Sequence, residues 1–183
     1  MKVTHDLRNE HEGVLLAPKI LEKICMKVDS KENFPIEHVE QILEFLRIFV
    51  DKCHHGKEED LLFPALEAVG IGKENGPIGV MLAEHQRGRN FVKEMAIGVD
   101  LSRSDIAQGT KKIVENARGY IDLLRQHIDK ENAVLFNMAD SMIPEAKQAE
   151  LIERFEEIEE KRVGHGKHEE FHRMLHSLRD RYL

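Results

Sequence analysis

Histidine and acidic residues recur in a fixed pattern in this chain. Residues 54–63 read HHGKEEDLLF and residues 127–136 read HIDKENAVLF, so both segments fit H-x-x-K-E-x-x-x-L-F. A glutamate–histidine pair precedes each segment, at Glu10-His11 and at Glu84-His85. The histidine of each pair lies 43 or 42 residues before the first histidine of its segment. We interpret the chain as two similar helical hairpins that face one another across a pseudo-twofold axis.

Helical periodicity predicts that these residues face the interior. Two apolar stripes, with residues three and four apart, each run into a histidine and a glutamate: His54 and Glu58 on one stripe, His127 and Glu131 on the other. His11 and His85 lie on two further apolar stripes. Each of the four helices therefore presents one histidine to the core, and two of the helices add a carboxylate.

Two buried carboxylates require compensation, because removing each ion from water costs several kcal/mol. Lys57 and Lys130 fall outside the apolar stripes, and protonated histidines would themselves be charges in an apolar core. Metal cations solve this problem more simply. Imidazole and carboxylate ligands suit iron, zinc, manganese or nickel, whereas calcium prefers more oxygen donors. We therefore expect two metal ions in the core, with Glu58 and Glu131 placed to bridge them.

The elements that must position these residues are all helical. Apolar residues recur at helical spacing in blocks near residues 3–28, 35–69, 77–97, 102–141 and 144–182, and no segment alternates with period two. Ser102 or Ser104 is expected to cap the fourth helix, and Gly164 and Gly166 to bend the fifth. Short connections favour an all-α, up-down-up-down four-helix bundle with an additional C-terminal helix. We expect a single domain over residues 1–183, with its core at about 3–141 and the extra helix at about 144–182.

Composition narrows the class of protein. The net charge is −7 over 183 residues, and lysine and arginine are scattered, so we expect neither nucleic acid nor an anionic membrane as a partner. The N-terminus is charged, and no apolar run is long enough to cross a bilayer, so we expect a cytoplasmic protein. Cys25 and Cys53 form no C-x-x-C pair and are expected to be reduced and buried.

The repeated H-x-x-x-E followed by L-F, together with the two E-H histidines, resembles the hemerythrin-like HHE cation-binding domain family over about residues 3–141. The resemblance implies a four-helix bundle around a non-haem di-iron centre. Two iron ions would be the cofactor, with zinc, manganese or nickel as substitutes. The ligands that the resemblance implies are His11, His54, Glu58, His85, His127 and Glu131.

Such a centre predicts a protein that binds or senses O2, NO or peroxide, or that handles iron; whether it turns over a substrate is left open. One alternative is a metal-dependent regulatory or interaction module, whose C-terminal helix contacts a partner protein. A less favoured alternative is a zinc hydrolase that uses the HEEFH motif between His168 and His172.

The remaining histidines are weaker candidates for metal ligands. His55 and Glu59 also have H-x-x-x-E spacing, but the polar pair Asp51-Lys52 lies one turn earlier on that face, which favours a solvated position. The C-terminal helix offers candidates for a seventh ligand, which are Glu156, Glu159, His165 and His172.

Overall fold

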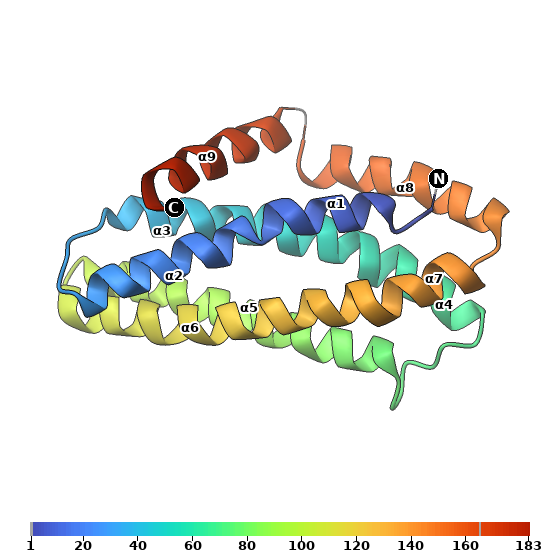
Figure 1. Ribbon diagram of the computed structural model, residues 1–183, viewed down its shortest axis with the longest axis horizontal. Helices are drawn as coiled ribbons and strands as arrows, with labels where there is room; N and C mark the ends of the chain where they lie inside the picture. The colour runs from blue at the N-terminus through green and yellow to red at the C-terminus, as the bar shows by residue number, and fades with distance from the viewer. Residues whose placement is uncertain (1, 165) are drawn as a thin grey trace.

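The computed structural model describes residues 2–164 and 166–183 of the chain. Figure 1 shows long helices lying side by side along the long axis, and the chain reversing direction at the connecting loops. No strand occurs in the described residues, so the prediction of an all-α helical bundle is confirmed. No helix in this part of the chain is long and apolar enough to cross a membrane.

The first expected helix, residues 3–28, is in fact two helices. Helix α1 spans His5–Val14 and α2 spans Leu16–Asp29, with a break at Leu15. Pro18 explains the break, because proline has no N–H to donate to the carbonyl of Val14 one turn earlier. The break leaves His11 in the last turn of α1 with its side chain in the core.

The second expected helix contains π-helical turns. It consists of α3 (Ile36–Phe45), the π-helical segments η1 (Leu46–His55) and η2 (Glu58–Leu62), and α4 (Phe63–Ala68). A π-helix bonds each N–H to the carbonyl five residues earlier, so each turn is wider than an α-helical turn. Both the histidines and the glutamate of the first repeated segment lie in these wide turns.

The third and fourth helices pack closely against each other. Helix α5 spans Pro77–Ser102, and the fourth helix consists of α6 (Ile106–Lys130), the π-helical η3 (Glu131–Leu135) and α7 (Phe136–Met142). Neither Ser102 nor Ser104 caps α6, contrary to the prediction. Asp105 is the cap, since its Oδ1 accepts a hydrogen bond of 3.0 Å from the backbone N–H of Gln108.

The C-terminal segment forms two helices rather than one bent helix. Helix α8 spans Glu145–Arg162 and α9 spans Lys167–Tyr182. Gly164 and Gly166 between them have φ of +88° and +82°, the left-handed region that glycine adopts readily. Figure 1 shows α8 running back along the bundle after α7 and α9 continuing toward the same end of the bundle. Helix α8 packs against η1 and η2, and α9 packs against α2 and α3.

Two clusters of buried apolar side chains fill the bundle, one on either side of its middle. Val14, Val50 and Ile128 belong to the cluster that includes α9, whereas Leu7 and Leu62 belong to the cluster beneath α8. Both cysteines are free and buried, as predicted. The buried histidines and glutamates lie along the chain between residues of these two clusters, which places them at the middle of the bundle.

Candidate metal centre

All the residues expected at the centre are buried. Their exposed fractions range from 0% to 4%, for His11, His54, Glu58, His85, His127 and Glu131. Periodicity correctly predicted that they face the core; their role as metal ligands stays a prediction.

The four histidines form two pairs. The Nε2 atoms of His11 and His54 lie 3.0 Å apart, and those of His85 and His127 lie 3.1 Å apart. In each pair, one histidine comes from the first helix of a hairpin and the other from the second helix of the same hairpin. The sequence repeat therefore corresponds to a repeat in three dimensions.

Glu58 lies between the two pairs. Its Oε1 is 3.5 Å from His54 Nε2, and its Oε2 is 3.4 Å from His85 Nε2. The carboxylate therefore presents one oxygen to each histidine pair, which is the orientation of a bridging ligand.

Glu131 lies between the same pairs from the opposite hairpin. Its Oε2 is 3.2 Å from His11 Nε2, and its Oε1 is 3.1 Å from His127 Nε2 and 3.7 Å from His85 Nε2. Two imidazoles and two carboxylate oxygens therefore converge on each half of the centre.

Hydrogen bonds outside the centre orient each imidazole. Every histidine of the two pairs donates its Nδ1 hydrogen to an oxygen that can only accept: His54 to Glu10 at 2.7 Å, His127 to Glu84 at 3.0 Å, His85 to Glu59 at 2.7 Å and His11 to Asn132 at 3.1 Å. Because Nδ1 carries the hydrogen, Nε2 keeps its lone pair and points it into the centre. Metal-binding histidines are held in this way.

The imidazole Nε2 atoms and the carboxylate oxygens that face one another in the centre are therefore all hydrogen-bond acceptors. Both oxygens of Glu58 and both of Glu131 are buried without a hydrogen-bond partner among the described residues. Lone pairs on nitrogen and oxygen that converge in an apolar core repel one another unless a cation lies between them. The residues present thus fit a metal centre.

The two carboxyl groups have opposite pKa shifts. Burial, reinforced by the negative charge of Glu131, raises the pKa of Glu58 well above its ordinary value. Burial also acts to raise the pKa of Glu131, but its proximity to His127 and His11 outweighs burial and lowers the pKa well below the ordinary value. Of the two carboxyl groups, Glu58 therefore binds a proton more readily.

Lys57 is buried, although it lies off the apolar stripe of its helix. Its side chain is only 2% exposed, and its Nζ donates to Glu10 Oε1 at 2.5 Å. Burial acts to raise the pKa of Glu10, but the hydrogen bonds and charges of His54 and Lys57 outweigh it and lower the pKa to about 2. Lys130 donates to Glu84 in the same way, although its own side chain is 40% exposed.

The phenylalanine at the end of each repeated segment contacts the opposite hairpin. Phe136 stacks on the ring of His11 with centroids 5.3 Å apart, and Phe63 stacks on His85 at 5.9 Å. Each phenylalanine thus covers a histidine of the other hairpin. The lysine and the phenylalanine are fixed positions of the repeat, so the repeat itself could have identified them. The residue after the glutamate differs between the two segments, Glu59 in one and Asn132 in the other, so the repeat did not mark it.

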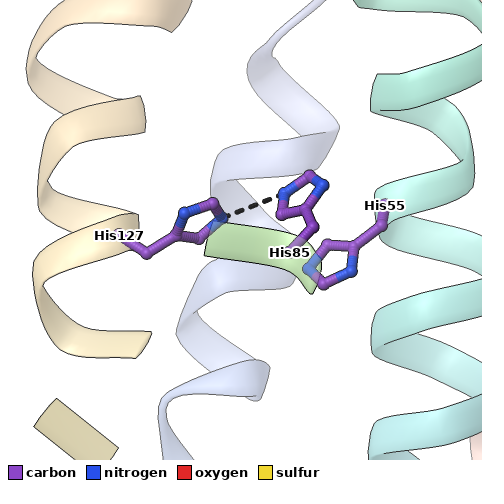
Figure 2. A group of neighbouring side chains, drawn as sticks. All are labelled: His55, His85 and His127. Atoms are coloured by element: carbon purple, nitrogen blue, oxygen red, sulfur yellow. Dashed lines mark hydrogen bonds between the residues drawn. The ribbon is translucent and has the colours of Figure 1, made fainter. Parts of the chain in front are cut away.

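His55 is also part of the centre, and its predicted solvated position is wrong. It is 8% exposed and stacks on His85, with ring centroids 3.8 Å apart and planes 14° apart. Figure 2 shows His55, His85 and His127 converging from three different helices. Ligand atoms of these three histidines lie within 4.8 Å of one another, as do those of His11, His54, Glu58 and Glu131.

The C-terminal helices contribute no member to either group in the part of the chain that the structure describes. Glu159 instead binds Lys57, with Oε2 3.0 Å from Nζ, and accepts from His168. Glu156 and His172 are exposed, and His165 lies outside the described residues. His168 and His172 of the HEEFH segment stack on each other, with centroids 5.0 Å apart.

Comparison with known proteins identifies relatives of the chain and its family. Proteins described as uncharacterized, one from Mycobacterium bovis and two from strains of Mycobacterium tuberculosis, are each 22% identical to it over 159 residues. The alignment covers 87% of this chain and 62% of each relative, so the chain spans less than two thirds of their length. No solved structure gives a significant match. The hemerythrin HHE cation-binding domain matches residues 2–139, and the chain belongs to this family.

Proposed function

We propose that this protein holds two iron ions between its hairpins and binds or senses a small ligand, such as O2, NO or peroxide. The observation that carries the proposal is the placement of Glu58 and Glu131, each with one oxygen facing each histidine pair. Iron would supply reversible redox chemistry and open coordination positions.

The donor set favours iron among the metals that accept nitrogen and oxygen. Two imidazoles with carboxylate oxygens form the kind of site that non-haem iron occupies with positions left open. The buried cysteines contribute no ligand to either group, and burial raises the pKa of Cys53 to about 12, so its thiol stays protonated. Zinc, manganese or nickel fit the same donors as substitutes.

A small cavity supports ligand binding beside His85 and His127. Its volume is about 10 Å³, close to the space that one water-sized molecule needs. Gly88 and Tyr120 line it, and a Cβ added at Gly88 would lie 3.7 Å from Tyr120 Cε2. A cavity no larger than one water-sized molecule favours a small ligand, such as a gas or peroxide, over a larger substrate.

The surrounding residues would hold the centre rather than carry out proton transfer. Glu10 and Glu84 fix two imidazoles, and Lys57 and Lys130 balance the charge of these carboxylates. The apolar clusters on both sides keep bulk water away from the centre, which strengthens electrostatic interactions inside it.

Metal analysis of the full-length chain tests this function. We expect about two irons per chain after anaerobic loading with ferrous iron, since the donors form two groups. His54→Ala and His127→Ala should each lose most of the metal of one group. His5→Ala changes an exposed histidine of α1 and should keep the full content. Retention of all iron in both core variants would contradict the proposal, and one zinc lost only on changing His168 or His172 would favour the hydrolase.

A metal-dependent regulatory module is a second candidate, supported by one contact. Lys57 joins Glu10, which orients His54, to Glu159 of α8. A change at the centre would therefore reach the C-terminal helices directly. Thermal stability that depends strongly on metal, without reversible binding of O2 or NO, would favour this candidate.

A further inference from the structure

A second cavity lies apart from the metal centre, beneath the C-terminal helices. Its volume is about 340 Å³, within the range of small-molecule pockets. Residues of α1, α3, η1, α8 and α9 line it. Neither group of potential metal ligands includes a residue of its α8 or α9 walls.

Aromatic rings form one wall of this cavity. Phe45 and Phe49 stack with centroids 5.3 Å apart, and Phe171 meets Phe45 edge-on at 5.5 Å. Phe155 lines the cavity from α8. These rings are 2–4% exposed, and the Lys167 ammonium lies 4.9 Å from the centroid of the Phe171 ring, so one ring of this wall already holds a cation.

Carboxylates also line the cavity. The acidic lining residues are Asp6, Glu10, Glu156 and Glu159. Lys57 is the only lysine or arginine among the described lining residues, and its Nζ already contacts both Glu10 and Glu159. The lining therefore carries an excess of negative charge beside aromatic rings.

We infer that this cavity binds a small organic cation, an amine with an aromatic or alkyl body. The apolar body would pack on the phenylalanine rings, and the ammonium group would donate to Glu159 or Glu10. The carboxylates repel an anion, and a neutral analogue gains neither the charge-assisted hydrogen bond nor the cation–π contact.

We expect a ligand bound in the cavity to change the properties of the metal centre, and this expectation rests on the function proposed above. Glu10 lines the cavity, and its other oxygen accepts the Nδ1 hydrogen of His54 at 2.7 Å. An ammonium that binds Glu10 competes with Lys57 and redistributes charge on this carboxylate. Changes in the outer partner of a ligand histidine alter metal affinity and electronic properties.

Calorimetry of the full-length chain with 2-phenylethylamine tests the site. The matched probes are 2-phenylethanol, which is neutral, and phenylacetate, which is an anion of similar size. We expect the amine to bind at least about tenfold more tightly than either probe, because hydrogen bonds to charged groups are about twice as strong as neutral ones. Equal or tighter binding of a matched probe, or no binding of the amine at millimolar concentration, overturns the proposal.

Variants locate the binding. Glu159→Gln removes one carboxylate that lines the cavity and should lower the affinity for the amine about tenfold. Glu153→Gln makes the same change on the exposed face of α8 and should leave this affinity unchanged. Gly13→Leu should block the cavity without strain, because a Cβ at Gly13 meets nothing within 4 Å. Unchanged affinity in both Glu159→Gln and Gly13→Leu would overturn this location.

Amine binding and its effect on the metal centre are tested separately. Calorimetry is performed on metal-free and on iron-loaded protein, so amine binding is measured even if the proposed iron site fails. Saturating amine should shift the absorption spectrum of the iron-loaded protein, and Gly13→Leu should abolish the shift. Amine binding without any spectral change overturns the coupling and leaves the site in place.

Discussion

Glu10 of the first hairpin and Glu84 of the second occupy equivalent positions, each accepting the Nδ1 hydrogen of the histidine that opens the repeated motif. Each also accepts from the lysine of that motif, Lys57 or Lys130. The pseudo-twofold arrangement therefore extends beyond the candidate ligands to the residues that orient them. Carboxylate–histidine pairs of this kind raise the basicity of a metal-binding imidazole.

Glu84→Gln should weaken metal binding without unfolding the chain. An amide in place of the carboxylate removes the charge that supports His127. We expect metal affinity to fall roughly 10–100-fold, which is the usual effect of losing such a partner. Lys130 is 40% exposed and remains solvated in the variant. Competition with a chelator measures the change, and Glu12→Gln on the exposed face of α1 is the control. Equal affinities for the variant and the control would contradict this role.

Metal binding should release protons at neutral pH. Burial raises the pKa of Glu58 in the metal-free chain, so this group binds a proton more readily than an exposed glutamate, and a carboxyl must lose its proton to coordinate a cation. Metal affinity should therefore rise with pH. The stability of the metal-free chain should fall as pH rises from the ordinary glutamate pKa through the raised pKa that Glu58 has in the folded state, because over this range Glu58 binds a proton more strongly in the folded than in the unfolded state. Titration calorimetry in buffers of different ionisation enthalpy measures the release, and Glu58→Gln should remove it. Heats that do not depend on the buffer would contradict the assignment.

Gly88→Val should block ligand binding while leaving the metal in place. The added methyl groups enter the cavity of about 10 Å³ beside His85 and His127. We expect the affinity for NO to fall about tenfold or more, since filling a small cavity forces unfavourable contacts of 1–3 kcal/mol. Ala149→Val, on the exposed face of α8, is the control. Spectroscopic titration with NO checks the result; full NO affinity in Gly88→Val would place ligand access elsewhere.

Phe171→Ala should destabilise the whole bundle. Phe171 of α9 is 3% exposed and belongs to the same buried cluster as α2, α3 and α6, so we propose that the C-terminal helices fold with the bundle as a single domain. Truncation of a buried phenylalanine costs about 3–5 kcal/mol of unfolding free energy. His176→Ala, on an exposed face of α9, should change it by less than about 0.5 kcal/mol. Chemical denaturation that gives the two variants equal stability would show that α9 is not part of the cooperative core.

The burial of the candidate ligands could be predicted because a sequence repeat and an amphipathic stripe pointed to the same residues. His54 and His127 were located by both signals, and Glu58 and Glu131 follow them by four residues. His55 was missed for a physical reason: the prediction assumed 3.6 residues per turn, whereas η1 is a π-helix with wider turns. Wider turns bring two consecutive histidines to the core side of one helix.

Tertiary contacts explain the other differences. Lys57 lies off the apolar stripe, yet α8 covers it and Glu159 pairs with it, and no periodicity within its own helix predicts that partner. A bend was expected at Gly164 and Gly166, and the helix axis does change there. The left-handed conformation of the two glycines ends one helix and separates it from the next, which is a larger change than a bend. By contrast, the break at Leu15 was predictable from Pro18 and was overlooked.

The most direct test of the central claim is the anomalous scattering of iron in crystals of the full-length, iron-loaded protein. The account predicts two iron peaks between Glu58 and Glu131, one within coordination distance of His11 and His54 and the other of His85 and His127. A single peak at the C-terminal helices, or crystals with no iron between the two glutamates, would contradict it.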